Sequence, residues 1–304
     1  MERKLEACAT LKRIGITLGD SAGIGPEIVQ AALASGRLPR TAEYSVIGSP
    51  VACSLGQSTQ ETAHAALDAL EESAALALRG EIQAVVTGPI HKARMYEIGF
   101  RFPGQTEFFA DRCSVKNFAM LLTGGKLTVA LVTTHLPLRE VATALNQGEI
   151  VRVGLLLEDF LHRRRILKPR IAVAGLNPHA GESGALGREE IEMIAPAVAE
   201  LQGAFGERAT VAGPFSPDTI FNRAATGDWD GVLCMYHDQG LIPLKLHAFH
   251  EGVNVTLGLP FARTSPDHGT AFEIAGKGVA RADSMIAAIN LAVELAPHTL
   301  ATSA

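Results

Sequence analysis

Three histidines are the residues of this sequence that most suggest chemistry, because each follows a short apolar run that is typical of a β-strand. They are His135, His179 and His237. The carboxyl ends of parallel strands meet at one edge of a sheet, which is where α/β proteins bind ligands. Neutral imidazoles gathered there can bind a divalent cation and leave a position open for substrate and water. A lone histidine at a strand end is more often a structural hydrogen-bonding group, and the spacing leaves both interpretations open.

Polar side chains stand next to two of these histidines in the sequence. Asp238 adjoins His237, and Asn177 and Glu182 flank His179. Such neighbours hold a ligating imidazole in one orientation by accepting the proton of its second ring nitrogen. Asp238 is also the candidate for a proton relay, because it adjoins a predicted ligand.

Two cations near predicted strand ends are candidates for binding an anion. They are Lys245 and Arg263. A guanidinium group captures phosphate or carboxylate through two parallel hydrogen bonds, although surface charge explains both residues equally well. The segment Gly104-Gln-Thr-Glu107 offers donors and acceptors at the start of a short predicted helix, where simple capping also accounts for Thr106.

A glycine-rich turn, Gly19-Asp-Ser-Ala-Gly-Ile-Gly-Pro-Glu27, follows the first predicted strand. It matches neither the dinucleotide-binding fingerprint nor the P-loop. Its backbone N–H groups could face an anion at the start of a helix, or the segment could be a tight strand-to-helix connection. The spacing favours neither interpretation.

Short runs rich in valine and isoleucine alternate with longer helical patterns along the chain. The predicted strands are Arg13–Leu18, Tyr44–Ile47, Ala84–Thr87, Ala119–Leu122, Val129–Thr133, Ile171–Ala174, Thr210–Ala212, Gly231–Met235 and Val253–Thr256. The predicted helices are Pro26–Ala34, Glu61–Leu78, Glu149–His162, Arg188–Leu201 and Ala282–Leu295. Continuous apolar strands are typical of parallel sheets, and the alternation predicts an α/β fold. No linker rich in glycine, serine or proline divides the chain.

Composition narrows the class of protein. Hydrophobic residues make up 47% and charged residues 19% of the chain, which indicates a large buried core. The net charge of −5 and the 5% of aromatic residues argue against a nucleic-acid partner. No apolar run approaches the length of a membrane span, and no signal peptide is visible. The four cysteines lack CxxC spacing, which indicates reduced thiols in a cytoplasmic protein.

Four segments together resemble the PdxA family of 4-hydroxythreonine-4-phosphate dehydrogenases. They are Gly19-Asp-Ser-Ala-Gly-Ile-Gly-Pro-Glu27, Leu176-Asn-Pro-His-Ala-Gly-Glu182, Tyr236-His-Asp-Gln-Gly-Leu241 and Val253-Asn-Val-Thr-Leu-Gly-Leu-Pro260. The resemblance runs in order from about Arg13 to Ala292. The segment from His268 to Gly278 is also similar to the cofactor-adenosine loop of isocitrate and isopropylmalate dehydrogenases, whose fold the family shares.

The resemblance implies a two-domain α/β/α subunit with an interdomain cleft. The first domain would comprise residues 1–110 and about 258–304, and the second about 111–257. Family members are homodimers whose active site is shared between subunits. They carry out NAD- or NADP-dependent oxidation of 4-phosphohydroxy-L-threonine with decarboxylation to 3-amino-2-oxopropyl phosphate, a step of pyridoxine phosphate biosynthesis.

The resemblance also assigns site residues. It implies one divalent metal, Zn, Mg, Mn or Co, on His135, His179 and His237, with the third of these, His237, supplied by the partner subunit. The implied substrate-binding residues are Gln105, Thr106, Lys245, Asn254 and Arg263. The implied cofactor-binding residues are His268, Gly269, Thr270 and Ala271.

Three departures from the family pattern bear on the substrate. Gln105 stands where the family has histidine, and an amide cannot carry a proton as imidazole can. Ser21 replaces a common proline, and a stretch that typical members have between Ser49 and Glu61 is missing. Related enzymes act on 4-phospho-D-threonate or 4-phospho-D-erythronate, which keeps that alternative open. A dihydrodiol dehydrogenase and a non-enzymatic regulator of the same fold are the competing hypotheses. The Asn254–Arg263 segment disfavours the first and the complete histidine set disfavours the second.

Overall fold

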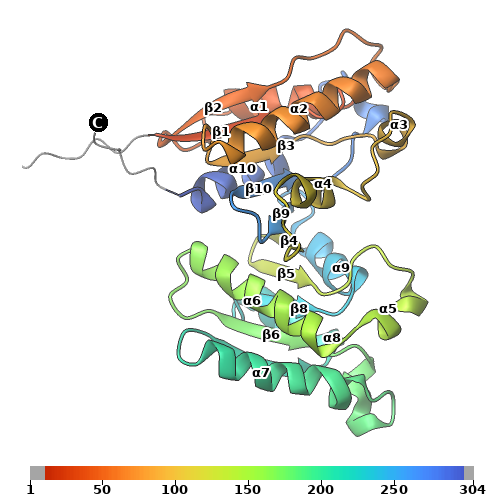
Figure 1. Cartoon of the computed structure of the whole chain (residues 1–304), viewed down its shortest axis with the longest axis vertical. Coiled ribbons are helices and arrows are strands. Elements are labelled where there is room, and N and C mark those ends of the chain that lie inside the picture. Colours follow the sequence, from red (N-terminus) through yellow and green to blue (C-terminus); the bar gives the residue numbers. More distant parts are fainter. Residues whose placement is uncertain (1–10, 298–304) are drawn as a thin grey trace, which may run out of the picture. The chain divides into compact units, whose positions relative to one another are not determined.

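The computed structural model describes residues 11–297, and the chain divides into two compact units (Figure 1). Unit 1 comprises Met1–Phe100 and Pro260–Ala304, and unit 2 comprises Arg101–Leu259. Cys8, one of the four predicted thiols, lies outside the described residues. The domain boundaries expected near residues 110 and 258 stay a prediction.

Unit 1 contains a parallel sheet with the strand order β2-β1-β3-β10. The strands are β1 (Lys12–Thr17), β2 (Ala42–Ile47), β3 (Ala84–Thr87) and β10 (Ala262–Pro266). The two strands β3 and β10 are buried along their whole length, as expected for a parallel sheet covered on both faces. All four strands point their carboxyl ends to the same edge.

The described part of unit 1 also contains four α-helices. They are α1 (Gly25–Ala34), α2 (Gln60–Leu78), α3 (Lys92–Glu97) and α10 (Asp283–Leu295). Helix α10 packs on β10 and β3 and also contacts α1, whereas α2 packs on β1 and β3 and contacts α3. Thr59 begins α2 with a capping box, because its hydroxyl accepts the Thr62 N–H and the Thr62 hydroxyl accepts the Thr59 N–H.

Unit 2 contains a mixed sheet with the strand order β9-β4-β5-β8-β6-β7. The strands are β4 (Ala119–Gly124), β5 (Leu127–Leu131), β6 (Arg170–Ala174), β7 (Thr210–Phe215), β8 (Gly231–Cys234) and β9 (Val253–Leu257). β4 runs antiparallel to both β5 and β9, while β5, β8, β6 and β7 are parallel. The expectation of purely parallel strands is therefore wrong at β4, because an apolar run fits any strand covered on both faces.

The helices of unit 2 surround this sheet. They are α4 (Gln105–Arg112), α5 (Leu138–Ala144), α6 (Gln147–Arg163), α7 (Ala195–Phe205), α8 (Pro217–Thr226) and α9 (His237–Ala248), with a π-helical turn η2 (Glu190–Ile194) before α7. The sequence patterns miss α5, α8 and α9. No helix within residues 11–297 combines the length and the apolar character needed to cross a membrane.

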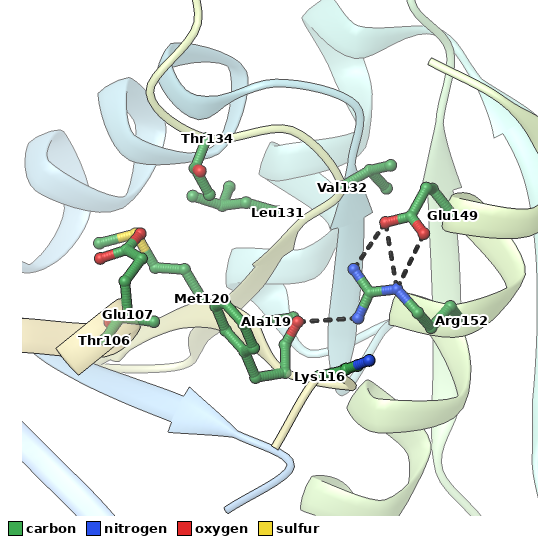
Figure 2. Close-up of a pocket in the computed structure, with 11 residues that line it drawn as sticks. Thr106, Glu107, Lys116, Ala119, Met120, Leu131, Val132, Thr134, Glu149 and Arg152 are labelled. Atoms are coloured by element: carbon green, nitrogen blue, oxygen red, sulfur yellow. Dashed lines mark hydrogen bonds and ion pairs between the residues drawn. The ribbon is translucent and has the colours of Figure 1, made fainter. Parts of the chain in front are cut away.

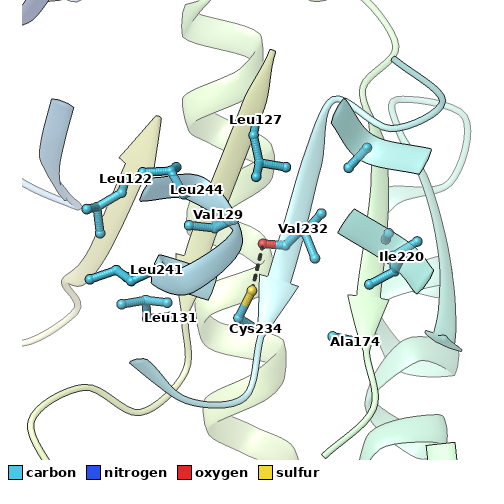
Figure 3. Close-up of a cluster of buried hydrophobic side chains, with 12 residues drawn as sticks. Leu122, Leu127, Val129, Leu131, Ala174, Ile220, Val232, Cys234, Leu241 and Leu244 are labelled. Carbon is cyan, nitrogen blue, oxygen red and sulfur yellow. Dashed lines mark hydrogen bonds between the residues drawn. The ribbon is translucent and has the colours of Figure 1, made fainter. Parts of the chain in front are cut away.

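The core of unit 2 on one side of the sheet is formed by residues of β5, β8 and β6 against α8 and α9 (Figure 3). Val129, Leu131 and Val232 of the strands meet Leu241 and Leu244 of α9, and all five are at most 6% exposed. Burying a side chain of this size stabilises the fold by about 1.5–3 kcal/mol. This packing fixes α9, and with it the residues at its start.

Candidate metal and substrate site

The three histidines follow three neighbouring strands of unit 2. His135 follows β5, His237 begins α9 directly after β8, and His179 follows β6; these strands are parallel and lie in the order β5-β8-β6. All three residues therefore stand at the same edge of the sheet, which is what the strand-end pattern predicts.

His135 and His237 are brought together. Their ring centroids are 5.7 Å apart, with the ring planes at 44°. The two strands stay in contact beyond their ends, because the Thr133 backbone N–H and hydroxyl both donate to the Met235 carbonyl, at 3.2 and 2.7 Å. Both rings line one pocket of about 380 Å³, together with Tyr236 and the apolar side chains of α5 and α9.

His179 does not join this pair within one chain. Its side chain is 62% exposed, and in residues 11–297 no three histidine, cysteine, aspartate or glutamate side chains are grouped to hold a metal ion. The reason lies in the segment after β6. Pro178–Gly184 (η1) is a left-handed turn in which His179, Ala180, Glu182 and Ser183 all have φ between 44° and 56°. Each such non-glycine residue costs roughly 1–2 kcal/mol.

Each of the three rings has a carboxylate on the Nδ1 side. Nδ1 of His237 lies 2.6 Å from Oδ1 of Asp238, and Nδ1 of His179 lies 2.9 Å from Oε1 of Glu182. Nδ1 of His135 lies 4.0 Å from Oε1 of Glu107. A carboxylate that accepts the Nδ1 proton leaves Nε2 with a free lone pair, which is the usual state of a metal-ligating histidine. The side chains present therefore fit a divalent cation.

The start of α9 is held by a side-chain bridge to the neighbouring strand. The Gln239 side chain accepts the Met235 N–H at 2.7 Å and donates to the Gly175 carbonyl at 2.6 Å. It thereby joins the ends of β8 and β6, from which His237 and the His179 turn arise.

Two neighbouring side chains of this segment have shifted acidity. Burial raises the pKa of Tyr236, and the nearby charge of Asp238 adds to the effect. Burial also raises the pKa of Cys234, so this thiol is unreactive. Neither group is therefore ionised at neutral pH.

Glu107 belongs to the Gly104–Glu107 segment that the sequence offers as donors and acceptors, but it is not among the predicted substrate-binding residues. One of its carboxylate oxygens, Oε2, is buried and has no hydrogen-bond partner among the described residues, which is costly unless a ligand donates to it. Thr106 is buried, and its hydroxyl lies 3.2 Å from that of Thr256.

Thr106 and Glu107 line a second pocket, of about 300 Å³ (Figure 2). Glu149 and Arg152 also line it, and the Arg152 guanidinium group donates to both carboxylate oxygens of Glu149 and, at 2.7 Å, to the Phe118 carbonyl. The hydrogen bonds from Arg152 hold the pKa of Glu149 below its usual value. The pair is therefore mutually neutralised at neutral pH.

The other predicted substrate residues are distributed over both units. Asn254 lies on β9, and its Oδ1 is buried without a hydrogen-bond partner in the described part of the chain. Lys245 lies on α9 and is half-buried. In unit 1, Arg263 on β10 is 2% exposed, and its Nη2 donates to the Thr87 hydroxyl at 2.6 Å. A buried guanidinium group held this way keeps a fixed orientation.

The predicted cofactor residues form the loop after β10. His268 and Gly269 are exposed, whereas Thr270 is buried and its carbonyl accepts the Ile24 N–H at 2.9 Å. Ala271 has a positive φ of 43°. The loop therefore has an exposed half, and its buried half anchors it in unit 1.

The glycine-rich turn supports this loop rather than facing an anion. The N–H groups of Asp20, Gly23 and Ile24 donate hydrogen bonds to backbone carbonyls. The N–H group of Ala22 donates to the Asp20 carboxylate. A Cβ atom at Gly23 would lie 2.7 Å from the Thr270 carbonyl oxygen. The turn is therefore a close-packed connection, and the structure favours that interpretation.

Comparison with known proteins agrees with this architecture. The sequence model of the family described as "Pyridoxal phosphate biosynthetic protein PdxA" matches residues 19–292. The chain is 43% identical to a 4-hydroxythreonine-4-phosphate dehydrogenase of Maricaulis maris, over 94% of this chain and 98% of that protein. It is 39% identical to a D-threonate 4-phosphate dehydrogenase of Salmonella typhimurium, over 94% and 99%.

Solved structures give the same result. A crystal structure of 4-hydroxythreonine-4-phosphate dehydrogenase from Klebsiella pneumoniae matches with a TM-score of 0.79 and 39% identity, over 94% of this chain and 100% of that one. An isocitrate dehydrogenase from Methylococcus capsulatus matches with a TM-score of 0.53 at 15% identity, over 93% and 85%, which shows a shared fold only. The predicted isocitrate dehydrogenase-like α/β fold is confirmed, and the chain belongs to the PdxA family.

Proposed function

We propose that this chain is an NAD- or NADP-dependent, divalent-metal-dependent dehydrogenase of 4-phosphohydroxy-L-threonine that yields 3-amino-2-oxopropyl phosphate and CO2. The observation that carries the proposal is the His135–His237 pair, set side by side at the end of two parallel strands in one pocket. Family membership supports the reaction class, since its relatives are dehydrogenases of phosphorylated hydroxy acids by name.

The resemblance implies that His237 comes from the partner subunit; because His135 and His237 already lie together in one chain, we propose instead that these two bind the cation together with His179 of a second copy. Two observations support this division: His179 lies outside the pair, and its ring is exposed with Nδ1 on Glu182. When bound, the cation would supply Lewis-acid stabilisation of negative charge on the substrate oxygen, and NAD or NADP would supply the hydride-accepting group.

The chain's own residues would orient the substrate. Arg263, whose guanidinium group is fixed by Thr87, would bind phosphate or carboxylate, and Lys245 would supply a second positive charge. Asn254 Oδ1 would accept a hydrogen bond from the substrate that no described residue supplies.

The remaining predicted residues would support the metal and the cofactor. Asp238 would hold the His237 ring through the 2.6 Å contact, and it stays the candidate for the proton relay. The loop after β10, with His268, Gly269, Thr270 and Ala271, would bind the cofactor's adenosine group.

A homodimer would complete the site. The outward side of α9 carries Ile242 and Leu246, which are 65% and 89% exposed, and Phe249 directly after the helix is 71% exposed. Leu138, which is 70% exposed, belongs to the same pocket as Ile242 and the two histidines. An exposed apolar surface next to an incomplete metal site is expected to bind another protein surface, and we propose that it binds a second copy.

The proposal is tested by a reduction assay with the purified protein. NAD⁺ and NADP⁺ are offered with 4-phosphohydroxy-L-threonine, 4-phospho-D-threonate and 4-phospho-D-erythronate, after chelation and after adding back Zn²⁺, Mg²⁺, Mn²⁺ or Co²⁺. We expect the fastest turnover on 4-phosphohydroxy-L-threonine and none in excess chelator. Full activity without metal would reject the metal site, and inertness toward all three acids would reject the substrate class.

A specific observation favours the second candidate, oxidation of 4-phospho-D-threonate or 4-phospho-D-erythronate. Gln105 begins α4 at the place where the family pattern has histidine, and the chain also resembles an enzyme named for D-threonate 4-phosphate. If 4-phospho-D-threonate or 4-phospho-D-erythronate is turned over faster than 4-phosphohydroxy-L-threonine, the second candidate replaces the first.

Replacing Gln105 with alanine should raise KM for the preferred substrate about tenfold and leave kcat nearly unchanged. An amide can bind substrate by hydrogen bonds but cannot transfer a proton. Its hydrogen bonds therefore stabilise the bound substrate and the transition state equally, and losing them raises KM without changing kcat. Steady-state kinetics of Gln105→Ala and Gln105→His check this. A large fall in kcat at constant KM would show that the residue acts in the chemical step.

A further inference from the structure

We propose that Glu190 is a positioning residue that holds the left-handed turn carrying His179 in the shape that presents its ring to a metal. The inference rests on the proposed function, because it takes His179 as a ligand. Nothing in the sequence around Glu190 identifies it, since it sits in an acidic helical segment that would ordinarily face solvent. Its carboxylate is nevertheless buried, with the residue only 3% exposed.

The Glu190 carboxylate accepts hydrogen bonds from the segment that leads into the turn. Oε1 accepts the backbone N–H groups of Leu176 and Asn177, each at 2.7 Å. Oε2 accepts the Asn177 side-chain amide at 3.0 Å. Three donors converging on one buried carboxylate form strong, charge-assisted hydrogen bonds. They fix the peptide groups two and three residues before His179.

The carboxylate also lies directly beneath the turn. A Cβ atom at Gly181 would be 2.6 Å from Oε2 of Glu190, so the carboxylate occupies the space below the second residue after His179. Glu190 therefore contacts the chain on both sides of His179. The consecutive residues with positive φ would not persist without such support.

The π-helical turn η2 places Glu190 in this position. Glu190 is its first residue, and Ile194 at its other end is buried in the core. π-helical turns are rare and recur at functional sites. The neighbouring Glu189 is a natural comparison, because its carboxylate accepts the same Asn177 side-chain amide, at 2.7 Å, while the two backbone N–H groups are donated to Glu190.

The inference is tested by metal affinity, which a general loss of stability does not change. Co²⁺ alone is titrated into the apoprotein and followed by its absorption bands. We expect Glu190→Ala to weaken Co²⁺ binding about 100-fold and Glu190→Gln about tenfold, since an amide oxygen can still accept two N–H groups; losses of this size are typical for residues that support metal ligands. Glu189→Gln should change the affinity less than about threefold.

Two further variants separate the possible outcomes. Leu201→Ala removes a fully buried side chain of α7, so it should lower stability toward urea while Co²⁺ affinity stays unchanged. His179→Ala should weaken Co²⁺ binding at least as much as Glu190→Ala. If His179→Ala has no effect, the proposed ligand set is wrong and the inference about Glu190 falls with it. If His179→Ala weakens binding but Glu190→Gln and Glu190→Ala do not, only the inference about Glu190 is overturned.

Hydrogen exchange gives a readout that does not involve metal. In Glu190→Gln and Glu190→Ala, the amides of Leu176 and Asn177 should exchange much faster than in the unmodified protein, and those of β6 should not. Unchanged exchange at these two amides would show that Glu190 does not hold the turn, whatever the metal affinity.

Discussion

Replacing His237 with alanine is expected to reduce turnover on the order of 10³-fold and to leave the fold intact. The expected loss is large because a cation that loses one of three ligands no longer stabilises charge on the substrate oxygen. Stability should change little, since His237 lies at the surface end of α9 and its side chain is 32% exposed. Turnover, bound metal and urea unfolding are measured on the same preparation. A variant that keeps both its metal and its activity would contradict the proposed site.

Mixing inactive variants tests whether two copies share the site. After unfolding and refolding together, His179→Ala and His237→Ala should regain about a quarter of the unmodified activity, because half of the dimers are mixed and each mixed dimer has one complete site. The matched control is His135→Ala mixed with His237→Ala. These two rings belong to one chain's pair, so no mixed dimer has a complete site and the mixture should stay inactive. Equal recovery in both mixtures would exclude the proposed division of ligands.

Most strands and the longer helices could be predicted from the sequence, because their apolar residues are the ones that are buried in the structure. The apolar run Ala84–Thr87, for example, is buried at every position and forms the predicted strand. The missed strand β10 contains arginine, threonine, serine and proline, which do not form an apolar run. It can be buried because the Arg263 side chain donates a hydrogen bond to the Thr87 hydroxyl and the Thr264 hydroxyl donates one to the Ala288 carbonyl. Those partners are distant in the sequence, so no local pattern reveals them.

The missed helix α9 shows a different limit. Gly240 and Pro243 lie inside it, and both residues disfavour helix interiors. Burial of Leu241 and Leu244 against the sheet outweighs these local preferences. The sequence patterns therefore placed His237 at a strand end but not at the first position of a helix.

The sequence predicts which edge of the sheet carries the candidate site, but it does not predict how the three histidines are arranged there. Strand ends predict where His135, His179 and His237 stand, because parallel strands share an edge. The pairing of His135 with His237 depends on β5 and β8 being neighbours. The position of His179 away from the other two rings depends on a left-handed turn and on Glu190, which follows the turn in the sequence. Neither neighbour relation is encoded in a local motif.

Replacing Leu246 with aspartate is expected to convert the protein to monomers and to lower turnover at least about 100-fold at concentrations where the unmodified protein is dimeric. Leu246 is 89% exposed on the outward side of α9, so a charge there costs the isolated chain little. In the proposed dimer the same charge would be buried without a partner, which strongly disfavours association. Molar mass from light scattering and turnover are measured together.

Leu167→Asp is the matched control for Leu246→Asp, because Leu167 is 91% exposed but lies outside the α9 surface. The same change of side chain at the same exposure should leave both molar mass and turnover unchanged there. The two losses in Leu246→Asp must also occur together, since a chain without its partner lacks a third imidazole. A monomeric Leu246→Asp protein with full activity would show that one copy suffices for catalysis, whereas a dimeric and active one would place the interface elsewhere.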